Sequence, residues 1–176
     1  EDSGTTEEDM LAMSKKTEHV TGLPPEYLRG TGFRERGGNP SPLTALGCYR
    51  GIRAAAHHRY GGDALMGLKV AVQGIGAVGL ELCKLLKQDG VELFITDTDQ
   101  LRLKAADDIL GGVHIVAPDD IYEVDAEVFA PCAMGGILND GTIPRLKAHI
   151  VAGAANNQLL KAHNDIQLLD RKILYV

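Results

Sequence analysis

The sequence lacks a run of apolar residues long enough to cross a membrane, and it lacks an excess of positive charge. A membrane-spanning helix needs about 20 consecutive apolar residues. The formal net charge is −6 at pH 7, and the lysines and arginines are scattered along the chain, so no basic face is expected. The composition therefore predicts neither a membrane nor a nucleic acid as a partner.

Cysteine is scarce, and no CxxC pair is present. Cys48, Cys83 and Cys132 are far apart and odd in number, which argues against a disulfide framework and against a zinc site. The adjacent His57 and His58 point in different directions on a predicted helix, so they are expected to be solvated rather than to bind a metal. We predict no metal site.

The first residue is Glu1 rather than Met, and no signal-peptide pattern is present, so a cytoplasmic location is expected. The last residues, 173–176, have the pattern of a β-strand cut at its end. Both ends lead us to expect a fragment of a longer protein.

The strongest motif is Gly74-x-Gly76-x-x-Gly79, which follows an apolar run and precedes a helical pattern. Gly74 is expected to make a tight turn, Gly76 to let the backbone approach a pyrophosphate, and Gly79 to let the helix pack on the strand. Ala77 and Val78 open that helix, whose N–H groups and partial positive charge favour phosphate. The motif therefore predicts a phosphate cradle.

An acid follows the next predicted strand, 91–96. Asp97 lies eighteen positions after Gly79, where dinucleotide-binding domains carry the acid that bonds the ribose. Alternatively, Asp97 only begins the turn toward the next helix. A 2′-phosphate would meet like charge at Asp97 and Asp99, which favours NAD over NADP.

Strands and helices alternate from residue 68 onward, which predicts an α/β fold with a Rossmann-type, doubly wound, mostly parallel sheet and helices on both faces. A capping box of Thr5 and Glu8 predicts a helix over 6–16, and Ser41 is expected to cap a helix that reaches Tyr60 and ends at Gly61. The remaining expected helices cover 99–109 and 164–169, and the remaining strands cover 114–117, 127–131, 149–151 and 173–176.

Small and polar residues follow two of these strands. Cys132, Ala133 and Met134 follow strand 127–131, on the side where a nicotinamide would lie. The amide of Asn156 could hold a polar head group or cap a helix. Thr44, in the first turn of helix 41–60, could face a ligand or bond its own backbone.

Three arginines occur in the glycine-rich loop 26–38, at positions 29, 34 and 36. They could reach a phosphate, but arginines on such a loop are more often solvated. Solvation is the favoured interpretation.

Five segments in the same order resemble leucine dehydrogenase and its relatives, the glutamate, phenylalanine and valine dehydrogenases. They are GNPSPLTALGCYRGIRAAA (38–56), LKVAVQGIGAVG (68–79), LFITD (93–97), FAPCAMGGILND (129–140) and VAGAANNQL (151–159). The resemblance implies NAD-dependent oxidative deamination of an L-amino acid, leucine or another branched-chain amino acid above all, to the 2-oxo acid, ammonia and NADH. It also implies a homo-oligomer for the full-length protein.

The resemblance implies roles for single residues. Asp2, in the stretch EDSGTT (1–6), would shuttle protons to and from the substrate. Thr44 would hold the nicotinamide amide, Ala133 and Met134 would line the nicotinamide ribose with Cys132 beside them, and Asn156 would contact cofactor or substrate. Residues 1–42 would be a segment and linker from a substrate domain, and residues 43–176 a truncated NAD-binding domain.

The family's catalytic lysine, which lies in a GGGKG stretch, has no counterpart in this sequence. This chain alone is therefore not expected to catalyse the reaction, and the residues that select the amino acid lie mostly outside it. Two alternatives have no chemistry, namely a dinucleotide-sensing regulatory module and a dimerising structural domain. Asp2 and Asn156 favour the enzyme, because a sensor needs neither.

Overall fold

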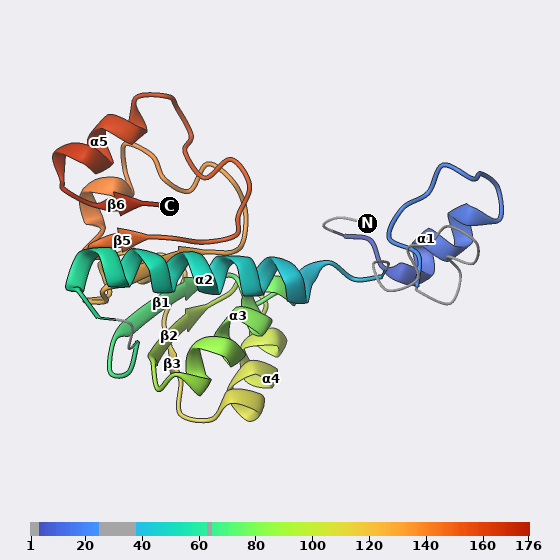
Figure 1. Ribbon diagram of the computed structural model, residues 1–176, viewed down its shortest axis with the longest axis horizontal. Helices are drawn as coiled ribbons and strands as arrows, with labels where there is room; N and C mark the ends of the chain where they lie inside the picture. Colours follow the sequence, from blue (N-terminus) through green and yellow to red (C-terminus); the bar gives the residue numbers. More distant parts are fainter. Residues whose placement is uncertain (1–3, 25–37, 63–64) are drawn as a thin grey trace. The chain divides into compact units, whose positions relative to one another are not determined.

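The computed structural model describes residues 4–24, 38–62 and 65–176. The chain divides into two compact units, Glu1–Leu43 and Thr44–Val176. A short helix, α1 (Glu7–Ser14), belongs to the first unit, and a six-stranded parallel sheet belongs to the second (Figure 1). The arginines of loop 26–38 lie outside the described residues.

The predicted capping pair of α1 is wrong by one residue. Thr6, rather than Thr5, caps the helix: its hydroxyl accepts from the Asp9 N–H, and the Asp9 carboxylate accepts from the Thr6 N–H at 2.8 Å. Both Thr5 with Glu8 and Thr6 with Asp9 have the spacing of a capping box, so the sequence pattern alone does not choose between them. The helix also ends earlier than predicted, at Ser14.

Helix α2 (Ser41–Tyr60) begins one residue earlier than predicted. Ser41 is its first helical residue rather than its cap, and the Asn39 side chain accepts a hydrogen bond from the Ser41 N–H at 2.9 Å. This bond from a backbone N–H to an Asn side chain two residues earlier is an Asx turn, and it leads the chain into the helix. The helix ends as predicted at Gly61, which adopts a φ of +78°.

The predicted parallel sheet is confirmed, and all of its strand pairs are parallel. The strand order is β3-β2-β1-β4-β5-β6, so the direction of winding reverses between β1 and β4. Ligands of such folds bind outside the carboxyl ends of the strands at this switch point. The strands are β1 (Lys69–Gln73), β2 (Glu92–Thr96), β3 (His114–Ile115), β4 (Val128–Pro131), β5 (Ile150–Val151) and β6 (Leu174–Tyr175).

Strands β3, β5 and β6 are shorter than the predicted 114–117, 149–151 and 173–176. β3 and β6 are the edge strands of the sheet, with one hydrogen-bonded neighbour each, and β5 pairs with the short β6. The other helical elements are α3 (Ala77–Gln88), α4 (Gln100–Leu110), η2 (Asp120–Glu123), η3 (Ile143–Arg145) and α5 (Asn164–Asp170).

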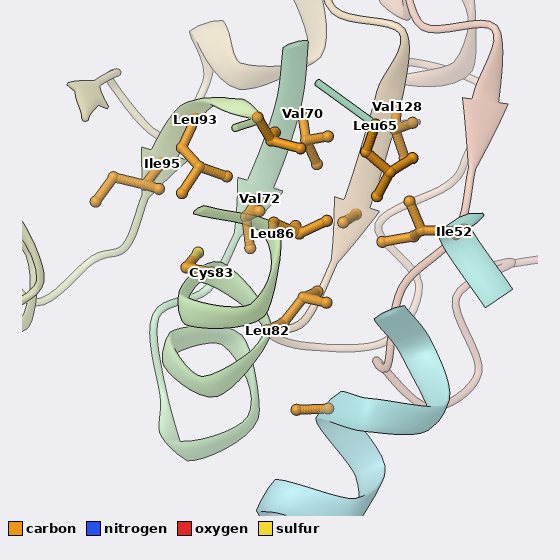
Figure 2. Close-up of a cluster of buried hydrophobic side chains, with 14 of the residues drawn as sticks. Ile52, Leu65, Val70, Val72, Leu82, Cys83, Leu86, Leu93, Ile95 and Val128 are labelled. Carbon is orange, nitrogen blue, oxygen red and sulfur yellow. The ribbon is translucent and has the colours of Figure 1, made fainter. Parts of the chain in front are cut away.

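Alternating side chains of the strands pack into two separate hydrophobic clusters. Val70 and Val72 of β1 lie in one cluster with residues of α2, α3 and α4, whereas Ala71 lies in the other with residues of η2, η3 and α5. Figure 2 shows Leu86 of α3 near Val72, with Ile52 of α2 in the same cluster. The sheet is therefore covered on both faces, as predicted. Within the described part of the chain, no helix is long and apolar enough to span a membrane.

Candidate functional site

The turn between β1 and α3 brings two of the three motif glycines against other backbone. Gly74 has a φ of +94°, and a Cβ added there would lie 2.8 Å from the Ala133 backbone nitrogen. A Cβ added at Gly79 would lie 2.0 Å from the Gly74 carbonyl oxygen. Only glycine fits either position, so the tight turn and the close helix packing expected from the motif are both found.

Gly76 differs from its two neighbours in the motif. It is the residue before α3, and a Cβ added there would meet no heavy atom within 4 Å in the described structure. Because glycine has no side chain, Gly76 makes no side-chain capping bond to the helix. The open space beside Gly76 therefore lies at the start of α3, where the N–H groups of Ala77 and Val78 have no acceptor within the helix.

Asp97 connects the glycine turn to the start of α4. One carboxylate oxygen accepts from the Ile75 N–H at 2.7 Å, and the other accepts from the Asp99 N–H at 2.9 Å. Asp99 is the residue that caps α4, accepting from the Leu101 N–H. Asp97 thus makes the turn toward the next helix, as the alternative interpretation of this residue predicted. Each of its oxygens keeps a second lone pair that can accept from a ligand hydroxyl.

The loops after β4 and β5 pack closely against each other. A Cβ at Gly153 would lie 2.2 Å from the Pro131 carbonyl oxygen, and one at Gly135 would lie 2.6 Å from the Asn156 carbonyl oxygen. The Gly136 N–H also donates to the Asn157 carbonyl at 2.8 Å. The sequence motifs around Met134 and Asn156, apart in the chain, therefore share one side of the sheet.

Three of the residues that the sequence singled out are exposed on these loops. Met134 is 74% exposed, and Ala133 and Asn156 are exposed as well. Gln158, which sequence reasoning missed, is buried and donates from its side chain to the Gly153 carbonyl at 3.0 Å. The only indication of Gln158 in the sequence was its position directly after Asn156 and Asn157.

Helix α2 borders the same region through Cys48. Its thiol donates to the carbonyl oxygen of Ala152, the residue after β5, at a distance of 3.9 Å. Thr44 lies one helical turn before Cys48 and is exposed. Asp2, the predicted proton shuttle, lies outside the described residues.

The pKa values of Cys48 and Cys132 are shifted in opposite directions. The Cys48 side chain, together with a hydrogen bond from the Ala154 N–H, lowers the pKa of Cys132 against the opposing effect of burial. The Cys132 side chain, together with burial, raises the pKa of Cys48. In the parts of the chain that the structure describes, no group of three His, Cys, Asp or Glu side chains could hold a metal.

Comparisons with known proteins agree with this geometry, although no family model matches the chain. A leucine dehydrogenase from Thermoactinomyces intermedius is 46% identical over 99% of this chain and 46% of its own length. The L-tryptophan dehydrogenase from Nostoc punctiforme is 43% identical over 99% of this chain and 47% of its own length. Its crystal structure matches with a TM-score of 0.75 and 46% identity over 77% of this chain and 41% of the other.

The chain is thus similar to one part of a leucine dehydrogenase and of an L-tryptophan dehydrogenase. It spans about half the length of the curated relatives that it matches. Its fold is the Rossmann-like part shared by these dehydrogenases, a likeness of fold that extends at 24% identity, with a TM-score of 0.73, to a hetero-hexameric glutamate dehydrogenase from Thermus thermophilus. The resemblance that the five sequence segments indicated is thereby confirmed.

Proposed function

We propose that this chain is the cofactor-binding part of an NAD-dependent L-amino-acid dehydrogenase. The observation that carries the proposal is the open space beside Gly76, at the start of α3, next to the Asp97 carboxylate. Homology to named amino-acid dehydrogenases over 99% of the chain supports the enzyme rather than a sensing module without chemistry. The reaction is L-amino acid + H2O + NAD⁺ → 2-oxo acid + NH4⁺ + NADH + H⁺.

The described residues fit a dinucleotide along the carboxyl edge of the sheet. The Ala77 and Val78 N–H groups would hold the pyrophosphate, because the helix start offers unpaired donors and a positive dipole end. Asp97 would accept from the hydroxyls of the adenosine ribose, and its negative charge would repel a 2′-phosphate. This arrangement favours NAD over NADP.

The nicotinamide half would lie along the loops after β4 and β5. Ala133 and Met134 would line its ribose, with Cys132 beneath them, and the Thr44 hydroxyl would bond its amide. Asn156 would contact cofactor or substrate. When bound, NAD⁺ supplies the acceptor for the hydride that leaves the substrate's α-carbon. Asp2 would hold and release the proton exchanged at the substrate nitrogen and at the attacking water.

Leucine or another branched-chain amino acid is the proposed substrate. The leucine dehydrogenase and the L-tryptophan dehydrogenase are 46% and 43% identical to this chain, so identity alone does not choose between an aliphatic and an aromatic side chain. A panel of L-leucine, L-valine, L-phenylalanine, L-tryptophan and L-glutamate, tested with the complete protein for NADH formation, decides it. L-leucine is expected to give the highest kcat/KM, and preference for L-glutamate or an aromatic amino acid would overturn this choice.

The cofactor site has its own test, which needs no turnover. NADH fluorescence is titrated against the wild type and against the variants Gly76→Val and Gly62→Val. The valine side chain at position 76 fills the open space, so NADH binding is expected to be lost while the circular dichroism spectrum is retained. Gly62 also has open space around it but lies after α2, so its variant is the matched control. Unchanged affinity in Gly76→Val would remove the phosphate cradle from the proposal.

A further inference from the structure

A hollow lies between the end of α2 and the turn that leads from α5 into β6 (Figure 1). It encloses about 450 Å³, which is within the usual size range of sites for small organic ligands. Because all strand pairs of the sheet are parallel, the start of β6 lies at its amino edge, opposite the carboxyl edge where the cofactor is proposed to bind. The residues that line the hollow are His58, Arg59, Leu169, Lys172, Ile173 and Leu174.

His149 holds the two sides of this hollow together. Its Nδ1 lies 3.1 Å from the hydroxyl of Tyr60, the last residue of α2. Its carbonyl accepts from the N–H of Leu174, the first residue of β6, at 2.9 Å. The end of α2 is therefore fixed beside the start of β6, and the hollow is largely formed before any ligand binds.

The lining combines three nitrogen donors with three aliphatic side chains. His58, Arg59 and Lys172 are the donors, and no carboxylate is among the lining residues. No ion pair of these three side chains occurs in the part of the chain that the structure describes. Leu169 is 73% exposed, so its apolar surface is open to a ligand. The lining therefore fits an anion with an apolar body.

We propose that this hollow binds an aliphatic monocarboxylate, with its carboxylate held by Arg59 and Lys172 and its tail lying on the aliphatic side chains. A guanidinium group offers two parallel N–H donors that match the two oxygens of a carboxylate. Inorganic phosphate would leave the aliphatic side chains uncovered, and an amine would meet charges of its own sign. The site does not depend on the proposed cofactor site, which lies at the opposite edge of the sheet.

Helix ends attract cations on their own, and this effect explains only part of the arrangement. Arg59 lies in the last turn of α2, where a positive charge interacts favourably with the helix dipole. The end of α5 already has such a cation in Arg171, which also donates to the Leu146 carbonyl at 2.6 Å. The dipole of α5 therefore does not require a second cation at Lys172.

Lys172 has a backbone conformation that lysine rarely adopts. Its φ is +56°, and its N–H donates to the Leu169 carbonyl at 2.8 Å, while the Ile173 N–H donates to the Leu168 carbonyl at 2.9 Å. These two bonds form the pattern of a helix end that glycine usually completes. Lysine is strained in this conformation, and a strained residue that lines a hollow indicates a use for its side chain.

Isothermal titration calorimetry of the complete protein with sodium octanoate tests the site. Lys172→Gly keeps the turn and removes the charge, whereas Lys172→Arg keeps the charge. Octanoate is expected to bind the wild type, and its affinity is expected to fall about 10-fold or more in Lys172→Gly, which loses a hydrogen bond to a charged group. Lys172→Arg is expected to keep most of the affinity.

Two controls separate binding from folding and from net charge. Because glycine favours a positive φ, Lys172→Gly is expected to be at least as stable in urea as the wild type. Lys104→Gln removes an exposed lysine on α4, outside the hollow, and is expected to leave octanoate affinity unchanged.

A ligand series tests the chemical class. Affinity is expected to rise from butyrate through hexanoate to octanoate, by up to about 4-fold for each CH₂ group that the aliphatic side chains cover. Octylamine and inorganic phosphate are expected not to displace octanoate.

Four results would overturn the proposal. They are no binding of octanoate to the wild type, equal affinity of the wild type and Lys172→Gly, equal affinity for butyrate and octanoate, and displacement of octanoate by phosphate or octylamine. Displacement of octanoate by NADH would place it in the candidate functional site and would overturn the proposal as well. Failure of the protein to bind NADH would contradict the proposed function alone, because the hollow lies at the other edge of the sheet.

Discussion

Gly76 and Gly79 are three residues apart, but a methyl group added at each meets different surroundings. At Gly79 it would lie 2.0 Å from the Gly74 carbonyl oxygen, whereas at Gly76 it would meet nothing within 4 Å. We predict that Gly79→Ala lowers the free energy of unfolding by about 1–3 kcal/mol or more, the cost of overpacking. Gly76→Ala is expected to cost less than about 1 kcal/mol, because only the helix cap changes. Urea denaturation of both variants measures the difference.

The sign of that difference is decisive. If Gly76→Ala were the less stable of the two, the helix would not pack on the turn through Gly79. The separate roles assigned to the three glycines would then be wrong.

The proposed preference for NAD over NADP depends on Asp97. We predict that Asp97→Asn weakens NADH binding by about 10-fold to 100-fold, the range for loss of a hydrogen bond to a charged group, and weakens NADPH binding less. Asparagine keeps the size of the side chain and one acceptor for the Ile75 N–H. Fluorescence titration with both cofactors measures the two losses.

Asp99→Asn is the matched control for this change. It removes a neighbouring charge of the same sign but leaves a good cap for α4, so NADH affinity is expected to change little and NADPH affinity is expected not to fall. Equal losses of NADH and NADPH affinity in Asp97→Asn would mean that Asp97 acts only on the turn.

At the level of elements, Asp140 attaches the start of α5 to the loop after β4. Its carboxylate accepts from His163 at 2.8 Å and from the buried Asn164 at 3.0 Å, and it pairs with Lys161 at 3.2 Å. The bonds from His163 and Lys161 lower the pKa of Asp140 from 3.8 to about 2. The ionised form of Asp140 therefore stabilises the folded state.

We predict a pH dependence from this carboxylate. Because its pKa is lower in the folded state, its contribution is fully present above the ordinary value of 3.8 and is lost as the pH falls toward about 2. The difference in urea midpoint between wild type and Asp140→Asn is expected to be largest near neutral pH and to shrink across that window. Because the carboxylate is exposed, added salt is expected to reduce the difference.

Asp170→Asn, at the end of α5, provides the comparison, because no ion pair of Asp170 occurs among the described residues. Its difference from wild type is expected to vary less over the same window. A difference for Asp140→Asn that grows on acidification would have the wrong sign for a carboxylate with a lowered pKa.

The elements themselves were largely predictable, and their ends were not. Alternation of apolar and helical patterns predicts the sheet because β1 and β4 are buried on both faces and therefore nearly continuous in apolar residues. The start of α2 was misplaced by one residue because Ser is a favoured capping residue, whereas Ser41 is the first helical residue and its N–H bonds to the Asn39 side chain.

The whole molecule contains contacts that no local pattern predicts. The glycine motif fixes Gly74 and Gly79 through spacing, but the approach of Gly153 to Pro131, and of Cys48 to Ala152, depends on how β4, β5 and α2 pack. Such contacts join segments with no periodic relation in the sequence. The candidate site was therefore predictable as a set of motifs, whereas its loop-to-loop constraints required the three-dimensional structure.

At the level of the whole molecule, cofactor binding and proton transfer are proposed for different parts of the chain. The residues proposed to hold the cofactor lie in the unit Thr44–Val176, whereas the proposed proton shuttle is Asp2, near the first residue of the sequence. We predict that Asp2→Asn in the complete protein lowers kcat by about 10²-fold to 10⁴-fold, the usual contribution of a general acid–base group. The NADH dissociation constant is expected to stay the same, because the cradle, Asp97 and the loops after β4 and β5 are untouched.

Steady-state kinetics with the preferred amino acid, together with NADH titration, separates these two effects. Asp9→Asn is the matched control, since Asp9 is a nearby carboxylate whose role is to cap α1. Its kcat is expected to remain within the error of the wild-type value. If Asp2→Asn kept its turnover, another group would handle the proton; if it lost NADH affinity instead, Asp2 would belong to the cofactor site, and the separation of binding from proton transfer would be wrong.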